Sequence, residues 1–134
     1  MKTFFSVLAF VFLSMFSFAQ NQTNPNLEIE QKEVIKKSAY LLFPTQNYWT
    51  FIKLDTRNGK MWQVHFTVED DAIHGELILN SIPLVDEEKE VNGRFTLYPT
   101  NNMYNFLLLD QIDGNVYQVQ WSMEEKYRGV IPIY

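Results

Sequence analysis

Apolar and polar residues alternate along much of this chain in short runs separated by turn-forming residues. The clearest run spans residues 61–66, where Trp62, Val64 and Phe66 alternate with polar residues such as Gln63. A period of two places successive side chains on opposite faces of an extended strand. The pattern therefore predicts a strand with an aromatic face directed into a core and a polar face directed outward.

The same reasoning predicts four strands in each half of the chain. In the first half we expect them over residues 40–43, 48–54, 61–66 and 75–79. The second half repeats the patterns from residue 95 onward and ends with a strand over 129–133. In its third strand, one set of residues is again expected to face the core: Tyr117, Val119 and Trp121.

An internal repeat accounts for the similarity of the two halves. Residues 40–55 return 55 positions later without a gap, and ten positions between residues 42 and 64 are identical to their counterparts. We therefore expect two copies of one unit, over residues 38–80 and 93–134, in a single β domain. Charged residues between the copies would form a connector.

Each unit carries the same turn signals. A Pro-Thr turn follows the first strand, and an Asn-Gly or Asp-Gly pair, which accepts the positive φ of a tight turn, follows the second. Asp55 and Asp110 open these second loops. We expect their carboxylates to accept hydrogen bonds from the backbone N–H groups of the turn.

Two units of four strands predict an all-β fold. The chain is 16% aromatic, and a single small sheet could not bury so many aromatic side chains. The two units must therefore pack on each other or close into a barrel. We expect two tandem four-stranded antiparallel meanders, related by a pseudo-twofold and packed as a sandwich or flattened barrel. A propeller typically needs at least four blades, which only an oligomer of this chain could supply.

Residues 1–19 have the pattern of a secretory signal peptide. Lys2 precedes an apolar run of about 15 residues, and a small-x-small site ends at Ala19. The alternative, an uncleaved anchor, would need a longer run of roughly 20 residues. We expect export to the periplasm or extracellular space, with no membrane span after cleavage. Residues 20–37 would form a disordered lead-in, expected over residues 21–26, and then a short helix or edge strand over residues 28–37.

Composition excludes several classes of function. The net charge of −5 becomes −6 when Lys2, the only charged residue of the signal, is removed. A nucleic-acid binder or a protein that docks on anionic membranes needs a clustered basic surface. The chain has no cysteine, so it has no disulfide, thiolate metal site or cysteine-linked lipid.

The chain resembles small exported proteins of the Bacteroidetes type that carry tandem repeats of the form LYPTxNxxxFxLLDxxxGxxWQVQ. The resemblance is carried by residues 97–110, Gly114 and residues 117–121, and by Trp62 to Val64 in the first unit. It covers nearly all of the mature chain. The resemblance implies export and the repeat, and it implies no active site.

The sequence contains no recognisable catalytic or metal-binding constellation. His65 and His74 could supply zinc ligands with carboxylates of residues 69–71, but the second unit keeps the acidic turn without either histidine. A glycan-cleaving enzyme would need two facing carboxylates, and Asp55 and Asp110 are the pair that both units keep. Turn capping explains the pair of aspartates without catalysis, so we expect no catalytic residue. We likewise expect no metal and no cofactor.

The candidate ligand-binding residues are aromatics beside the Pro-Thr turns and two glutamines. We expect most of these aromatics in the core, because aromatic residues at strand spacing usually lie there. A central strand with aromatics on both faces can leave some of them exposed, and exposed tyrosine and tryptophan favour protein or sugar binding. The glutamines are predicted on the outward face of their strands, where a cross-strand amide ladder competes with a ligand contact as the explanation. The candidates are Trp49, Tyr104, Gln63, Gln118, Tyr48 and Tyr98.

These observations favour a small exported, non-catalytic binding or interaction module. Its expected partner is an unknown protein or glycan of the cell envelope, and nucleic acid is not expected. Two alternatives stay open: a glycan-cleaving enzyme, and a structural envelope subunit that assembles through open sheet edges.

Overall fold

The structure is a computed structural model that describes residues 24–134. The expected signal peptide over residues 1–19 and the first residues of the expected lead-in lie outside the described residues. Within the described part of the chain, no helix is both long and apolar enough to cross a membrane.

Residues 24–134 form one α-helix, eight strands and two short 3₁₀ helices. The first unit is preceded by the helix and contains four strands: α1 (Pro25–Lys37), β1 (Tyr40–Pro44), β2 (Thr50–Asp55), β3 (Met61–His65) and β4 (Gly75–Asn80). The connector contains η1 (Glu87–Lys89). The second unit contains β5 (Phe95–Pro99), β6 (Asn105–Asp110), β7 (Val116–Gln120), η2 (Glu125–Tyr127) and β8 (Gly129–Ile133).

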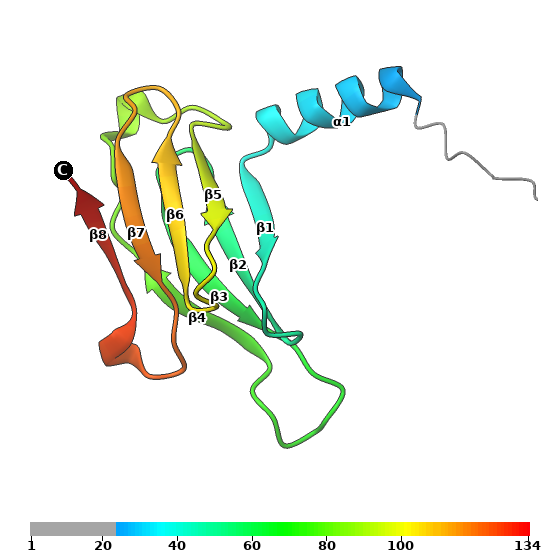
Figure 1. Cartoon of the computed structure of the whole chain (residues 1–134), viewed down its shortest axis with the longest axis vertical. Coiled ribbons are helices and arrows are strands. Elements are labelled where there is room, and N and C mark those ends of the chain that lie inside the picture. Colours follow the sequence, from blue (N-terminus) through cyan, green and yellow to red (C-terminus); the bar gives the residue numbers. More distant parts are fainter. Residues whose placement is uncertain (1–23) are drawn as a thin grey trace, which may run out of the picture.

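The strands form two antiparallel meanders. The first sheet has the order β1-β2-β3-β4 and the second has the order β5-β6-β7-β8. The first three strands of each sheet have the same register: Phe51 pairs with Val64, and Phe106 pairs with Val119. Figure 1 shows the sheets as two layers, with β5–β8 in front of β1–β4. The expected sandwich of two four-stranded meanders is confirmed, and the sheets do not close into a barrel.

Helix α1 resolves the choice between a helix and an edge strand. Asn24 caps its first turn, where Oδ1 accepts a 3.1 Å hydrogen bond from the Asn26 N–H, and Pro25 suits the first helical position. Pro25 and Asn26, expected in the disordered lead-in, therefore begin the helix instead. At the other end, Ser38 Oγ donates to the Val34 carbonyl. The helix projects away from the sandwich (Figure 1).

The core lies between the two sheets. Both contribute apolar side chains that are almost completely buried, and the second sheet adds the largest ones. The core residues are Ile52, Leu54, Met61, Leu79, Phe95, Leu97, Phe106, Leu108, Val119 and Trp121. Aligned packing of this kind removes one face of each sheet from water and leaves the other face outside.

The prediction of which face is buried was wrong for the first unit. In β3 the buried residues are Met61, Gln63 and His65, while Trp62 and Val64 lie on the outer side. Strand β2 is apolar on both faces, but its outer face carries Lys53. Turning the aromatic face inward would bury that ammonium group, which is costly without compensation.

The second unit buries the face that the sequence predicted. Val119 and Trp121 are core residues, and Tyr117 packs against them. Leu108, at the position that corresponds to Lys53, is fully buried. The two sheets therefore meet through non-corresponding faces of the repeated unit. This differs from the expected pseudo-twofold, because a two-fold axis would bring corresponding faces together.

Candidate functional site

The Pro-Thr turns hold one aromatic residue of each unit at the same end of the molecule. Thr45 Oγ1 donates to the Thr50 carbonyl at 2.9 Å, and Asn47 Oδ1 accepts from the Trp49 N–H at 2.9 Å. The second unit repeats this network, with Tyr104 in place of Trp49: Thr100 Oγ1 donates to the Asn105 carbonyl, and Asn102 Oδ1 accepts from the Tyr104 N–H. The turn chemistry therefore fixes where both aromatic side chains leave the backbone.

Each of these two aromatic side chains packs against a second aromatic ring. Trp49 packs edge-on against Phe66 with a centroid separation of 5.4 Å, and Tyr104 lies 5.2 Å from Trp121. Trp121 is itself buried and donates through Nε1 to the Met103 carbonyl at 2.8 Å. The supporting ring limits the rotation of the exposed one, so little side-chain entropy remains to be lost on binding.

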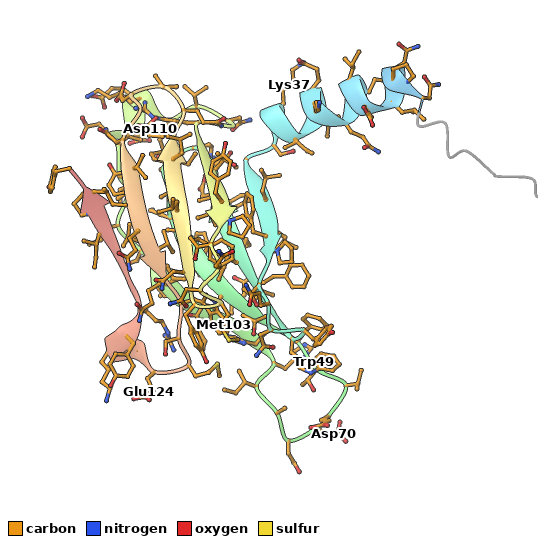
Figure 2. All side chains as sticks on the ribbon, viewed as in Figure 1. Lys37, Trp49, Asp70, Met103, Asp110 and Glu124 are labelled. Carbon is orange, nitrogen blue, oxygen red and sulfur yellow. The ribbon has the colours of Figure 1, made fainter. Side chains whose placement is uncertain are left out.

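Further apolar side chains are exposed beside these turns, and Tyr48 retains 90% of its surface. Figure 2 places Trp49, Met103 and Glu124 at one end of the sandwich, opposite Asp110 and Lys37. We call this surface the aromatic end. It comprises Tyr48, Trp49, Tyr104, Met123 and Tyr127, each of which is at least 46% exposed. Exposed apolar groups gathered in this way mark interaction sites on many proteins.

A hollow of about 430 Å³ lies in the aromatic end beside Tyr104. Its volume is in the range of small-molecule sites. Aromatic and amide side chains line it, together with one carboxylate. The lining residues are Asn102, Tyr104, Asn105, Gln120, Trp121, Ser122, Met123, Glu124 and Tyr127.

The predicted site residues separate into two groups. Tyr48, Trp49, Tyr98 and Tyr104 are exposed, but Gln63 is fully buried between the sheets. The outward placement predicted for Gln63 was therefore wrong. The first sheet buries the face that carries Gln63, because the opposite face carries the charged Lys53.

Gln118, the counterpart of Gln63, is half-buried on the outer side of the second sheet. Its Nε2 donates to Asn105 Oδ1 at 3.2 Å. Asn105 lies on the neighbouring strand and is the register partner of Gln120. The contact is thus a cross-strand amide pair, and it ties β7 to β6 at the aromatic end.

His65 is a satisfied core histidine. Its Nδ1 lies 3.1 Å from Thr50 Oγ1, and its Nε2 lies 3.1 Å from Gln63 Nε2. Burial lowers the pKa of His65, and the positive charge of Arg128 lowers it further. No three histidine or carboxylate side chains in residues 24–134 are grouped closely enough to share a metal ion.

Asp55 and Asp110 cap turns, as predicted. Asp55 Oδ1 accepts from the Arg57 N–H, and Asp110 Oδ1 accepts from the Ile112 N–H, both at 3.0 Å. Each carboxylate also pairs with an arginine, at 2.7 Å with Arg57 and at 2.8 Å with Arg94.

Burial acts to raise the pKa of both carboxyl groups, but hydrogen bonds from the arginines and from the turn backbone, together with nearby positive charge, outweigh it and hold each pKa below its usual range. Both groups are almost fully buried. An ionised, buried carboxylate with its oxygens already paired does not supply the proton that glycoside cleavage requires.

Sequence reasoning missed a second hollow, a polar cleft of about 980 Å³ at the opposite end. Its lining includes Tyr40 and Trp62 together with residues 83–88 and Glu90 of the connector. Both rings already face cations of the protein: Arg57 lies 5.3 Å from the Tyr40 centroid, and Lys53 Nζ lies 4.7 Å from that of Trp62. The only sequence signal for the cleft was the charge of the connector.

The chain matches no protein-family model, no curated protein and no solved structure.

Proposed function

We propose that this chain is a small exported, non-catalytic binding module that holds a glycan at its aromatic end. The observation that carries the proposal is the pair of supported aromatic side chains, Trp49 and Tyr104, of which the second borders a hollow lined by amides. Sugar rings offer apolar C–H faces and a rim of hydroxyl groups, so a suitable site combines aromatic surface with a few polar groups.

The polar groups around the hollow suit a neutral ligand. Asn102, Asn105 and Gln120 supply amide donors and acceptors, and Glu124 adds a carboxylate. No lysine or arginine lines this hollow within the described residues, and Glu124 pairs with Lys126 outside it. An anionic ligand would meet the unfavourable charge of Glu124, whereas a polyhydroxylated neutral ligand could bond to all four side chains.

We propose a non-catalytic protein because of the state of the two candidate catalytic carboxylates, Asp55 and Asp110. Asp55 and Asp110 are kept ionised by their arginine partners, and they lie at the end of the sandwich away from the aromatic end. We propose that the protein is exported because residues 1–19 have the pattern of a signal peptide.

The test is a titration of the mature chain, residues 20–134, with soluble neutral hexasaccharides of glucose and N-acetylglucosamine. Binding is followed by calorimetry and by tryptophan fluorescence, because Trp49 lies in the proposed site. Trp49→Ala and Tyr104→Ala should each weaken binding by about tenfold or more, which corresponds to about 1.4 kcal/mol. Tyr134→Ala is the matched control, since it removes an exposed aromatic ring at the C-terminus, far from the aromatic end (Figure 1).

Two results would count against the proposal. Binding that survives both substitutions would move the site elsewhere. Failure of every glycan, combined with a protein that is captured from envelope extracts by the parent and lost in both variants, would replace the glycan by a protein partner at the same surface.

A further inference from the structure

The outer face of the first sheet repeats the buried face of the second. Residues on this outer face have counterparts 55 positions later that form the core, as with Leu42, which is 59% exposed, and Leu97, which is 3% exposed. The outer residues are Tyr40, Leu42, Phe51, Lys53, Val64 and Phe66. Their counterparts are Phe95, Leu97, Phe106, Leu108, Val119 and Trp121, all nearly fully buried.

The converse holds for the outer face of the second sheet. Leu107 is 38% exposed, but its counterpart Ile52 is fully buried against the other sheet. The same relation joins five further pairs of residues. The outer residues are Asn105, Leu107, Leu109, Val116, Gln118 and Gln120, and their buried counterparts are Thr50, Ile52, Leu54, Met61, Gln63 and His65.

The contact within the chain is therefore heterologous, because two different faces of one unit meet. Such a contact leaves one copy of each face unused at the two sides of the sandwich. We propose that a second copy of this chain packs the outer face of its first sheet on the outer face of the second sheet of its neighbour. The contact between chains would repeat the one that joins the two sheets within a chain.

Polar groups on the two outer faces correspond to those that bond across the core. Within the chain, Ser122 donates its N–H to Gln63 Oε1 at 3.0 Å, and Phe95 donates its N–H to the Thr56 carbonyl at 2.8 Å. The counterparts of these four residues are Thr67, Gln118, Tyr40 and Gln111. Between chains, Thr67 would donate to Gln118 Oε1 of the neighbour, and Tyr40 would donate to the neighbour's Gln111 carbonyl.

One position sets the strength of the contact between chains. Lys53 stands where the core has Leu108, and it forms an ion pair of 2.6 Å with Glu76. Glu76 pairs in register with Val64, as Val130 pairs with Val119. Burying this ion pair costs desolvation energy that Leu108 and Val130 do not incur. The association is therefore weaker than the contact within the chain, and it is reversible.

A heterologous contact gives a ring if its rotation closes and an open stack if it does not. A closed ring of four-stranded sheets has the architecture of a propeller. This inference does not rest on glycan binding, but the two surfaces adjoin. Asn105 and Gln120 line the hollow and also belong to the outer face of the second sheet, and Trp49 packs on Phe66 of the other outer face.

The experiment measures the mass of the mature chain by sedimentation over a hundredfold range of concentration. We expect the average mass to rise with concentration beyond that of a dimer. Leu42→Lys, on one outer face, and Leu107→Lys, on the other, should each weaken association by about tenfold or more, because each buries an uncompensated charge in the contact. Ile82→Lys is the matched control, since Ile82 is exposed on a loop outside both faces.

Mixing the two variants distinguishes this contact from a symmetric dimer. Each variant keeps the face that the other has lost, so an equimolar mixture should form dimers that do not grow further. A variant with Lys53→Leu and Glu76→Val, which copies Leu108 and Val130 onto the outer face, should associate at least about tenfold more tightly. Adding Leu107→Lys to it should remove this gain.

Three outcomes would overturn the proposal. The first is a parent chain that stays monomeric at every concentration, and the second is association that responds to only one of the two face variants. The third is an Ile82→Lys control that weakens association as much as the face variants do. Circular dichroism establishes that each variant is folded. Glycan titration of the Leu42→Lys variant, whose substitution lies outside the hollow, reports on the aromatic end apart from association.

Discussion

The backbone N–H of Ser122 donates a hydrogen bond to Gln63 Oε1, and this bond joins the second sheet to the first through a fully buried side chain. Because an N–H can only donate, the amide oxygen must face Ser122 and the amide nitrogen must face His65. His65 Nε2 therefore accepts, and the ring proton lies on Nδ1, where Thr50 Oγ1 accepts it. One backbone donor thus fixes the amide orientation and the tautomer of a neutral histidine.

Replacing Gln63 should destabilise the fold more than replacing its counterpart. Gln63→Leu leaves the Ser122 N–H and His65 Nε2 buried without partners, and each such loss costs about 1–3 kcal/mol. Gln118→Leu changes a half-buried residue of the outer face and should cost less than about 1 kcal/mol. Urea unfolding of both variants measures the difference, and equal losses would contradict the role of the bond between sheets.

The free energy of unfolding should fall on mild acidification because of His65. Its folded-state pKa lies below the unfolded value of about 6.5, since burial and the charge of Arg128 oppose protonation. Only the unfolded state then takes up the proton, so the stability is complete above pH 6.5 and declines as the pH falls below it. A protonated ring would also lose the bond from Gln63.

The measurement is chemical unfolding at pH 7.5 and pH 5.5. His65→Gln, which copies the residue at position 120, should flatten the dependence on pH in this range. Asp55 and Asp110 do not interfere, because their lowered pKa values place their effect below about pH 4. An unchanged slope in the variant would assign the effect to another group.

Loss of Asp110 should be more damaging than loss of Asp55. The pair formed by Asp110 and Arg94 is buried on both sides. Asp110→Ala leaves the buried guanidinium with only the half-exposed carboxylate of Asp113 as an ionic partner, and should cost about 3 kcal/mol. Arg57, the partner of Asp55, keeps about a third of its side-chain surface and can reach water. We expect Asp55→Ala to cost about half as much or less, as judged by the midpoint of urea unfolding. A larger loss of stability for Asp55→Ala than for Asp110→Ala would show that the first loop depends more strongly on its capping aspartate than the second loop does.

Gly59 and Gly114 form a matched pair for testing backbone strain. They have φ angles of +80° and +77°, which side-chain-bearing residues adopt at a cost of about 1–2 kcal/mol. A Cβ on Gly59 would also lie 2.7 Å from Leu84 Cδ1, whereas a Cβ on Gly114 meets no atom within 4 Å. Gly59→Ala should therefore lower the thermal midpoint more than Gly114→Ala, and a Leu84→Ala background should narrow the gap.

The strands, their turns and the repeat were predictable because each depends on local chemistry. Alternation fixes a strand, and glycine at positive φ fixes a tight turn, so the fourth strand of each unit was expected within a residue of where it lies. The buried face of the first unit was not predictable in this way. Strand β2 presents Ile52 and Leu54 on one side and Phe51 on the other, and only the position of Lys53 argues for one face.

The candidate site, like the fold, was predictable from the sequence only where it depends on local chemistry. The turns that hold Trp49 and Tyr104 are visible in the sequence. The exposure of Tyr48, Trp49 and Tyr104 was not predictable in the same way, because aromatic residues at strand spacing usually face a core. The polar cleft depends on a connector that lines it together with Tyr40 and Trp62, residues 20 or more positions away. Local patterns contain no information about such a distant contact.

The inverted burial of the two units also bears on how the duplicated segments can evolve. Recombination that copied the first unit over the second would place a lysine at position 108, inside the core. Such exchange between the copies lowers stability and would be removed by selection. The two halves of the gene are therefore expected to drift apart at strand positions, while their turns, which have the same role in both units, stay alike.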